Sequence, residues 1–185
     1  NCYVTMKISF ANELAAIYEN ISGADVDVVT TAIGADARVG RKYLKGGLGF
    51  GGPCFPRDNL AFQRCAEDAG TCAHLSPRVV EVNGEVVDRL FAMVGRHVPP
   101  GSTVALLGLS YKPGTHIVEE SQSVTLAERL LDAGYTVRMH DPKALASASA
   151  ALQGRGVYCD CPYDAACGAS VVVLLTPWLE YTHLD

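Results

Sequence analysis

The feature that most restricts the fold is a change of hydrophobic pattern near residue 100. Beyond it, short apolar runs alternate with helical stretches, which is typical of parallel βαβ units. The run Val171 to Val173 is typical of a strand covered on both faces. We therefore expect an α/β protein in which residues 99–185 form a doubly wound parallel sheet. The apolar runs are TVALLG (103–108), TVRMHDP (136–142), VYCD (157–160) and SVVVLLTP (170–177), with helical stretches at 124–133 and 143–153.

The preceding part of the chain, residues 1–98, is expected to be a helical domain, because its apolar residues recur at spacings of three and four. One helix ends before Gly23, a second covers 25–33, a third follows Arg57 and Asp58 and ends at Gly70, and a long amphipathic helix covers 76–97. The apolar face of the first helix comprises Val4, Ile8, Ala11, Ala15 and Tyr18, and that of the long helix comprises Val79, Val82, Val86, Leu90 and Met93.

Composition excludes several partners. The net charge of -5 and the pI near 5.5 oppose binding to nucleic acid or to an anionic membrane. No apolar run approaches the length of about 20 residues that a membrane span needs, and the N-terminus does not resemble a signal peptide. The 7 cysteines are odd in number and show no C-x-x-C framework. We therefore expect reduced thiols and a cytoplasmic protein.

The stretch GRKYLKGGLGFGGPCFPRDNL, residues 40–60, concentrates glycines, cations, a cysteine and an aspartate. Gly47, Gly49 and Gly52 satisfy G-x-G-x-x-G, but they do not follow a strand, so we reject a dinucleotide fingerprint here. Glycines allow backbone N–H groups to approach a ligand closely, and Arg41 and Lys45 offer positive charge to a phosphate. The alternative is a flexible surface loop.

Cys54 ends the glycine stretch and lies just ahead of the expected third helix. Helix-end N–H groups and nearby cations favour the thiolate, which is the nucleophilic form and can attack an aldehyde. Asp58 lies one helical turn further on, where its carboxylate can face the thiol and orient or deprotonate a water. The alternatives are a buried structural cysteine and a helix-capping aspartate.

A metal site is the less favoured use of the segment HIVEE. His116 lies near Glu119 and Glu120, but the segment lacks the H-E-x-x-H register and a further ligand. We expect no metal.

The motif GFGGPCFPRD, residues 49–58, resembles the catalytic loop of the UDP-glucose and GDP-mannose 6-dehydrogenase family. NCYVTMKISFANELA and GADVDVVTTAIGAD resemble two helices of the family's central domain, and VALLGLSYKPGT and TVRMHDP resemble strands of its C-terminal domain. The resemblance covers nearly the whole chain. It implies a central dimerisation segment followed by a Rossmann-like nucleotide-sugar-binding domain, without the family's N-terminal NAD-binding domain. Because a further helix begins at Trp178, we expect the second domain to be C-terminally incomplete.

The family's functional residues carry over to particular positions. Cys54 matches the nucleophile that captures an aldehyde as a thiohemiacetal and then a thioester, and Asp58 matches the residue that assists hydrolysis. Asn1 matches an asparagine near the reacting sugar, whose lysine partner would precede this chain by four residues. The other matching positions are Tyr43, Lys45, Phe50 and Gly51 for diphosphate and sugar, Tyr111 and Lys112 for base and sugar, and Arg38 for the partner subunit's substrate. For Arg38 and Lys112 the alternative is a solvated surface charge.

The resemblance implies an NAD-dependent, two-step oxidation of a sugar CH2OH to a carboxylate, with a nucleotide sugar as substrate. A covalent thiol adduct keeps the intermediate bound between two hydride removals, and no side chain can accept a hydride, so NAD is the implied cofactor. We also expect a homodimer through the helix at 76–97, whose apolar stripe would otherwise be exposed. The sequence leaves the base and the sugar open.

One position departs from the family pattern. Where relatives read D-D-x-R-E-S, this chain reads HIVEES, with Glu119 in place of an arginine that helps to bind NAD. A carboxylate near a pyrophosphate is repulsive. Two alternatives follow, a catalytically degenerate module that binds nucleotide sugar or dimerises, and a hydroxyacid dehydrogenase of the 6-phosphogluconate type. The second has no reason to retain the cysteine loop.

Overall fold

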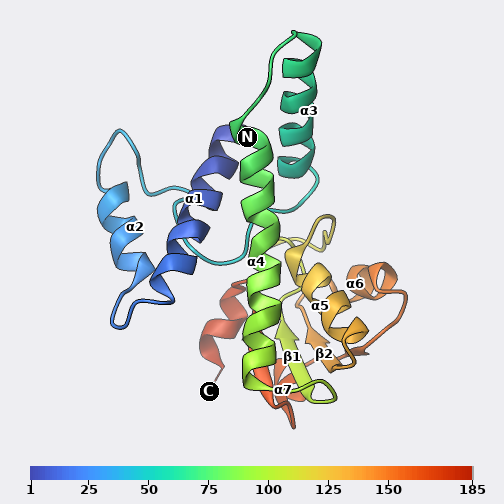
Figure 1. Ribbon diagram of the computed structural model, residues 1–185. Coiled ribbons are helices and arrows are strands. Elements are labelled where there is room, and N and C mark those ends of the chain that lie inside the picture. Colours follow the sequence, from blue (N-terminus) through green and yellow to red (C-terminus); the bar gives the residue numbers. More distant parts are fainter. Residues whose placement is uncertain (185) are drawn as a thin grey trace. The chain divides into compact units, whose positions relative to one another are not determined.

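The structure, a computed structural model, describes residues 1–184, so Asp185 of the expected C-terminal domain lies outside the described residues. The chain forms two compact units, Asn1–Val86 and the part from Val87 onward, and each is described by itself. The helix α4 (Leu75–His97), labelled in Figure 1, belongs to both, because the division falls inside it. The helix ends next to the expected domain limit at 98/99, and the domain limits 1–98 and 99–185 stay a prediction.

The first unit is helical, as the sequence predicts. It contains α1 (Cys2–Tyr18), α2 (Val26–Gly34), α3 (Phe55–Asp68) and the first half of α4. The side chain of Asp25, the residue at which the sequence predicts the second helix to begin, caps α2 by accepting from the N–H of Asp27 at 2.8 Å. The third helix begins earlier than expected, because Pro56 fits the first turn of a helix, where a missing N–H costs nothing.

The buried face of α1 differs from the predicted one. Ala11 and Ala15 are buried as expected, but Val4 and Ile8 are only half-buried. The positions that pack inward are instead polar, namely Thr5, Ser9 and Asn12. Their side chains find hydrogen-bond acceptors or donors in neighbouring segments, so an apolar pattern alone does not reveal this face.

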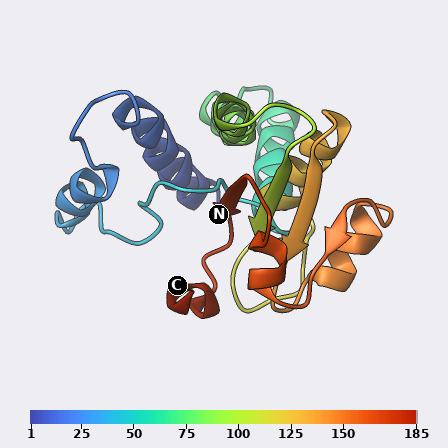
Figure 2. The ribbon, with the colours of Figure 1, turned by 90° about the horizontal axis from the view of Figure 1, so that it is seen from below.

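The second unit is a parallel α/β sheet, as predicted. Its strands lie in the order β3-β2-β1-β4, and every neighbouring pair is parallel. The order reverses at β1, which is the property of a doubly wound sheet. Figure 2 shows β1 between β2 and β4. The elements are β1 (Thr103–Leu107), α5 (Gln122–Asp132), β2 (Thr136–His140), α6 (Leu145–Ala151), β3 (Val157–Tyr158), α7 (Pro162–Ala166), β4 (Val171–Leu174) and the 3-10 helix η1 (Leu179–His183).

The strand β4 is not covered on both faces, which corrects the expectation drawn from Val171 to Val173. Val172 and Leu174 are 47% and 57% exposed, whereas alternate residues are half-buried. The strand is at the edge of the four described strands and pairs only with β1 there. A β-branched run therefore reports strand propensity here, but not burial of both faces.

The second unit is held together around the carboxyl end of its sheet. A buried cluster of Leu107, Cys159, Ala165, Trp178 and Tyr181 joins β1 to the chain segments that follow β3 and β4. Elsewhere in the second unit, Arg129 of α5 forms an ion pair with Asp88 of α4, and its guanidinium lies 5.2 Å from the Phe91 ring centre. Within residues 1–184, no helix combines the length and the apolar character that a membrane span requires.

Candidate active site

Cys54 occupies the N-cap position of α3, and its side chain is exposed. The backbone turns into the helix at this residue, since the Asp58 N–H donates to the Cys54 carbonyl oxygen at 2.8 Å. The side chain does not cap the helix. The thiol is therefore accessible at the start of α3.

Asp58 lies in the first turn of α3, where the Asn1 side chain meets it. The Asn1 amide donates to Asp58 Oδ2 at 2.5 Å, and Arg57 lies 3.3 Å from Oδ1. The hydrogen bond from Asn1 lowers the pKa of Asp58 against a smaller opposing effect of desolvation, and Arg57 lowers it further. The structure thus brings Asn1 and Asp58 together one turn from Cys54, and Asp58 is a carboxylate at neutral pH.

A buried polar network fixes the start of α3. Asn59 is fully buried, and its amide donates to Thr5 Oγ1 of α1 at 3.0 Å and to the Phe55 carbonyl oxygen at 2.8 Å. Ser76 of α4 donates to Asn59 Oδ1 at 3.0 Å. Because all members are satisfied inside the protein, the network holds the helix bearing Cys54 against α1 and α4 in one register.

The glycine loop is anchored to two helices by asparagine side chains. Asn12 of α1 accepts from the Gly47 N–H at 2.9 Å, and Asn83 of α4 accepts from the Phe50 N–H at 2.7 Å. Asn83 also donates to the Phe50 carbonyl oxygen at 3.0 Å. The Phe50 side chain is buried, and Gly51 is buried beside it. The loop therefore has a defined conformation, which opposes the alternative of a flexible surface loop.

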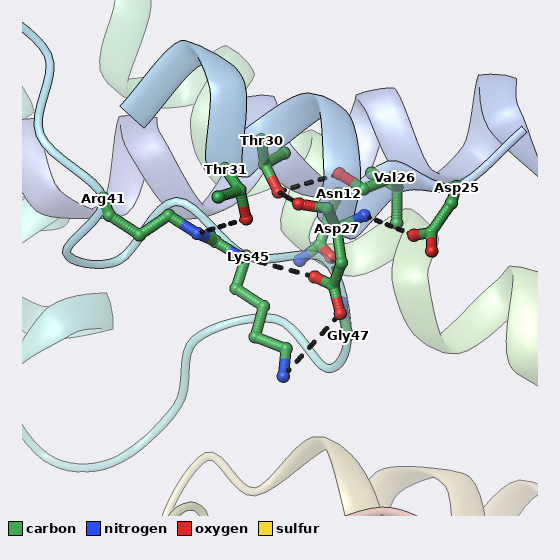
Figure 3. A network of polar contacts seen from close by, with 9 residues as sticks. All are labelled: Asn12, Asp25, Val26, Asp27, Thr30, Thr31, Arg41, Lys45 and Gly47. Atoms are coloured by element: carbon green, nitrogen blue, oxygen red, sulfur yellow. Dashed lines mark hydrogen bonds and ion pairs between the residues drawn. The ribbon is translucent and has the colours of Figure 1, made fainter. Parts of the chain in front are cut away.

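The two expected phosphate-binding cations meet a carboxylate on α2. Asp27 lies 3.4 Å from the Arg41 guanidinium and 3.9 Å from Lys45 Nζ, and Figure 3 shows its carboxylate facing both. Arg41 also donates to Thr31 Oγ1 at 3.2 Å. Lys45 remains 70% exposed at the surface, so its ammonium group is accessible to an anionic ligand.

Tyr43 and Arg38 occupy exposed places on the same unit. Tyr43 has a left-handed backbone, with φ at 65°, and its ring lies edge-on to the Phe55 ring at 6.3 Å. Arg38 is highly exposed and pairs with Asp36 at 2.5 Å. That hydrogen bond raises the pKa of Arg38 and lowers the pKa of Asp36. Within this chain Arg38 is therefore directed at a local carboxylate.

Tyr111 and Lys112 lie in the second unit, in the loop that follows β1. Lys112 is exposed, and its Nζ lies 5.4 Å from the Tyr111 ring centre. The Tyr111 N–H donates to the Ile117 carbonyl oxygen at 3.2 Å, which closes the loop on itself. The loop leaves the carboxyl end of a parallel strand next to the point where the strand order reverses, and ligands of doubly wound sheets bind there.

A buried carboxylate that the sequence did not single out organises this edge. Asp141 follows β2 and accepts hydrogen bonds from loops after three different strands. Burial raises the pKa of Asp141, but backbone N–H donors outweigh it and lower the pKa overall. The donors are the N–H of Leu109 at 2.7 Å, the N–H and Oγ of Ser110 at 3.0 and 3.1 Å, the N–H of Lys143 at 2.8 Å, the N–H of Ala144 at 2.7 Å and Trp178 Nε1 at 3.1 Å.

No group of three or more His, Cys, Asp or Glu side chains suited to a metal occurs among residues 1–184. A groove of about 440 Å³ lies between α1 and α4 in the first unit. Its lining includes Phe10, Glu13 and Val82, and none of the predicted site residues lines it.

Fold and site together define an α/β protein of two compact units. One has an exposed cysteine at the start of a helix, and the other has a doubly wound sheet of the kind that commonly binds nucleotides. Residues 1–85 match the central domain of the UDP-glucose/GDP-mannose dehydrogenase family, and residues 105–185 match the UDP binding domain of the same family. The chain belongs to the UDP-glucose/GDP-mannose dehydrogenase family.

Known relatives agree with this assignment. A UDP-glucose 6-dehydrogenase of Rhizobium meliloti is 37% identical over 100% of this chain and 43% of its own length. The enzyme TuaD of Bacillus subtilis, a UDP-glucose 6-dehydrogenase, is 36% identical over 100% of this chain and 40% of its own length. The structure of a UDP-glucose dehydrogenase from Pyrobaculum islandicum superposes with a TM-score of 0.95 at 37% identity, covering 100% of this chain and 43% of that one. The chain thus spans less than half the length of these relatives.

Proposed function

We propose that this chain is the thiol-bearing and nucleotide-sugar-binding part of a nucleotide-sugar 6-dehydrogenase of the UDP-glucose type. The observation that carries the proposal is the exposed Cys54 at the start of α3, one turn from a carboxylate that Asn1 holds ionised. Relatives named UDP-glucose 6-dehydrogenase support the substrate class. The cytoplasmic location remains a prediction from the sequence.

The proposed reaction removes two hydrides from C6 of the sugar. Loss of the first hydride and the hydroxyl proton converts the CH2OH group to an aldehyde. The Cys54 thiol adds to the aldehyde carbon, and its proton goes to the oxygen, which gives a thiohemiacetal. Loss of the second hydride and the hydroxyl proton leaves a thioester, and water then cleaves the C–S bond, releasing the carboxylate and restoring the thiol.

Asp58 is proposed to orient the hydrolytic water. Its lowered pKa keeps it ionised, so that it can accept a hydrogen bond from water, and makes it a weak base. Of the two roles that the sequence left open, orientation of the water fits this electrostatic environment better than its deprotonation. Asn1 fixes the carboxylate through the hydrogen bond to Oδ2 and belongs to the proposed catalytic group.

The hydride acceptor that we propose is NAD+, but residues 1–184 do not fit a dinucleotide. The loop after β1 reads GLSYK, without the glycine fingerprint. Asp141 cannot hold a ribose hydroxyl, because protein donors occupy both its oxygens. We therefore propose that NAD+ binds outside this chain. Glu119 is exposed, so a cofactor that approaches the loop after β1 would meet a negative charge.

Each unit has its own residues proposed for the nucleotide sugar. In the first unit, Lys45 would meet the diphosphate, and Tyr43 and the segment at Phe50 and Gly51 would border the sugar. In the second unit, Tyr111 with Lys112 would contact the base and the sugar. Arg38 would reach the substrate of a partner subunit, which requires it to leave Asp36.

The stoichiometry of NADH formation tests this function. We expect a protein that contains this chain and an NAD-binding domain to form two NADH for each UDP-glucose converted to the acid, as the four-electron oxidation requires. The 185-residue chain alone should bind UDP-glucose in a calorimetric titration and form no NADH. NADH formation by the chain alone would contradict the assignment. Binding by the larger protein without turnover would favour the degenerate binding module.

The homodimer is also proposed, with a different surface from the expected one. In α4 the stripe residues Val79 and Val86 are buried within the chain, and Val82 is half-buried. By contrast, α1 exposes Tyr3, Phe10 and Ile17 at 62%, 46% and 51%. These side chains recur every seven residues and so form one stripe along the helix. We propose that this stripe of α1, next to the groove between α1 and α4, contacts a second copy of the chain.

Phe10→Glu should weaken this dimer at least tenfold, because it places a charge in an apolar contact. Sedimentation equilibrium of the wild-type and variant proteins measures the change. Val28→Glu is the matched control, since Val28 is an exposed apolar residue on α2, outside the stripe. A wild-type protein that stays monomeric at high micromolar concentration would contradict the proposal.

A further inference from the structure

We propose that Asn83 of α4 is a positioning residue for the Cys54 thiol and acts through Phe50. Its effect on turnover rests on the proposed function, whereas its effect on the thiol does not. The Asn83 side-chain amide binds both backbone groups of Phe50.

The contact between Asn83 and Phe50 is two-sided. Asn83 Oδ1 accepts from the Phe50 N–H at 2.7 Å, and Nδ2 donates to the Phe50 carbonyl oxygen at 3.0 Å. An amide that pairs with the N–H and C=O of one residue acts as a strand neighbour would, and it fixes the orientation of both peptide planes. The backbone of Phe50, which lies in a loop, is thereby held as firmly as that of a residue paired within a β-sheet.

Phe50 contacts the start of α3, so a fixed Phe50 restrains the first residue of that helix. Its ring is 4% exposed and lies edge-on to the Phe55 ring, with centroids 6.2 Å apart. Phe55 is the first residue of α3 and directly follows Cys54. The residues between Phe50 and Cys54 are Gly51, Gly52 and Pro53, and Gly52 has a left-handed φ of 77°. Two adjacent glycines have no side chains to hold their own conformation, so the anchor must come from the neighbouring Phe50.

A second amide anchors the same loop three residues upstream. Asn12 is fully buried in α1, and it accepts from the Gly47 N–H at 2.9 Å (Figure 3) and donates to the Leu48 carbonyl oxygen at 3.5 Å. The loop is thus attached to α1 at Gly47 and Leu48 and to α4 at Phe50. Of the two anchored sites in the loop, the one held by Asn83 is nearer to the thiol, because Phe50 lies closer to Cys54 in the sequence than Gly47 does.

These anchors also limit which loop atoms can bind a phosphate. The N–H groups of Gly47 and Phe50 already donate to Asn12 and Asn83, so they are not available to a ligand in this conformation. The segment around Phe50 therefore borders the proposed site without donating these N–H groups to the ligand. The exposed Lys45 ammonium is accessible to a diphosphate. A change at Asn83 should consequently affect kcat more than the KM of the nucleotide sugar.

The experiment compares Asn83→Ala and Asn83→Asp in the full-length enzyme. Ala removes the two hydrogen bonds to Phe50, whereas Asp keeps the acceptor for the Phe50 N–H and places a carboxylate oxygen against the Phe50 carbonyl. We expect the rate at which iodoacetamide alkylates Cys54 to change at least about threefold in both, because the thiol no longer keeps its position at the start of α3. Turnover should fall about tenfold or more with little change in KM. Peptide mass spectrometry and steady-state kinetics measure these effects.

Asn20→Ala is the matched control, because the exposed Asn20 amide binds only the Ala16 carbonyl oxygen within its own turn in the described hydrogen bonds. It should leave alkylation and kcat unchanged. If Asn83→Ala does not fold, Asn83→Asp and Asn12→Ala carry the comparison. Unchanged alkylation and kcat in folded variants, even with a lower melting temperature, would overturn the inference. If the wild-type enzyme does not oxidise nucleotide sugars, the proposed function fails, and alkylation alone decides the role of Asn83.

Discussion

On the proposed function, Cys54→Ser in a protein that contains this chain and an NAD-binding domain should reduce carboxylate formation by on the order of 100-fold or more. An alcohol is far less acidic than a thiol, so attack on the aldehyde becomes slow at neutral pH. An oxygen ester, if it forms, is also hydrolysed more slowly than a thioester. Nucleotide-sugar binding should persist, because Lys45 and Lys112 are unchanged. Steady-state rates, intact-protein mass spectrometry and a binding titration measure the three effects.

The matched control for this substitution is Cys65→Ser. Cys65 is also an exposed cysteine of α3, but it lies three turns from the helix start. Its replacement should leave the rate within about twofold, since surface changes away from special contacts have small effects. Near-normal carboxylate formation by the Cys54→Ser enzyme would show that Cys54 is a structural loop residue, and the covalent mechanism would then be abandoned.

Local signals predicted most of the secondary structure. The Asp25 cap, the stop before Gly23 and the long stripe from Val79 to Met93 each act within a few residues, so they are visible in the sequence. The alternating runs after residue 100 likewise predicted the parallel sheet. The exposed face of β4 was not predictable, because exposure depends on which strand lies at an edge, and that follows from the topology.

The site residues likewise fall into those whose positions follow from local spacing and those whose contacts depend on the tertiary fold. Motif spacing suggested that Cys54 and Asp58 lie one turn apart, and the structure has them so. The contacts of Asn12, Asn83 and Asp27 join segments distant in sequence, and no spacing rule reveals them. A partial signal existed for Asn12, which interrupts the apolar positions Ala11 and Ala15 of α1, because a polar residue inside such a stripe requires a partner. The sequence indicated Asp141 only as a member of the strand motif TVRMHDP, residues 136–142, without a role of its own.

Asp141→Asn should destabilise the second unit by about 3 kcal/mol, because charge-assisted hydrogen bonds to a buried carboxylate contribute strongly and their loss leaves buried donors unpaired. Every described partner of Asp141 is a donor, so one of the asparagine positions must direct an NH2 group at other donors. The protein has 1 tryptophan, and its Nε1 donates to Asp141 at 3.1 Å. Its fluorescence should therefore shift, and thermal unfolding should occur several degrees lower.

The same substitution should weaken nucleotide-sugar binding, because Asp141 holds the N–H groups of Leu109 and Ser110, directly before Tyr111 and Lys112. Its effect on stability should depend on pH in a defined direction. The lowered pKa of Asp141 means that the carboxylate stabilises the fold above the unfolded-state pKa of about 3.9, and that this contribution is lost as the pH falls through the lower folded-state value. The difference between wild type and variant should thus narrow below about pH 4.

Asp132→Asn provides the comparison that isolates burial. Asp132 is 62% exposed and forms a surface ion pair with Arg155, so its replacement should cost less than about 1 kcal/mol. The two variants make the same chemical change in the same unit, but only Asp141 is enclosed by donors from three loops. Equal shifts of the unfolding temperature in the two variants, or unchanged tryptophan emission in Asp141→Asn, would contradict the role of Asp141 as the group that holds these loops together.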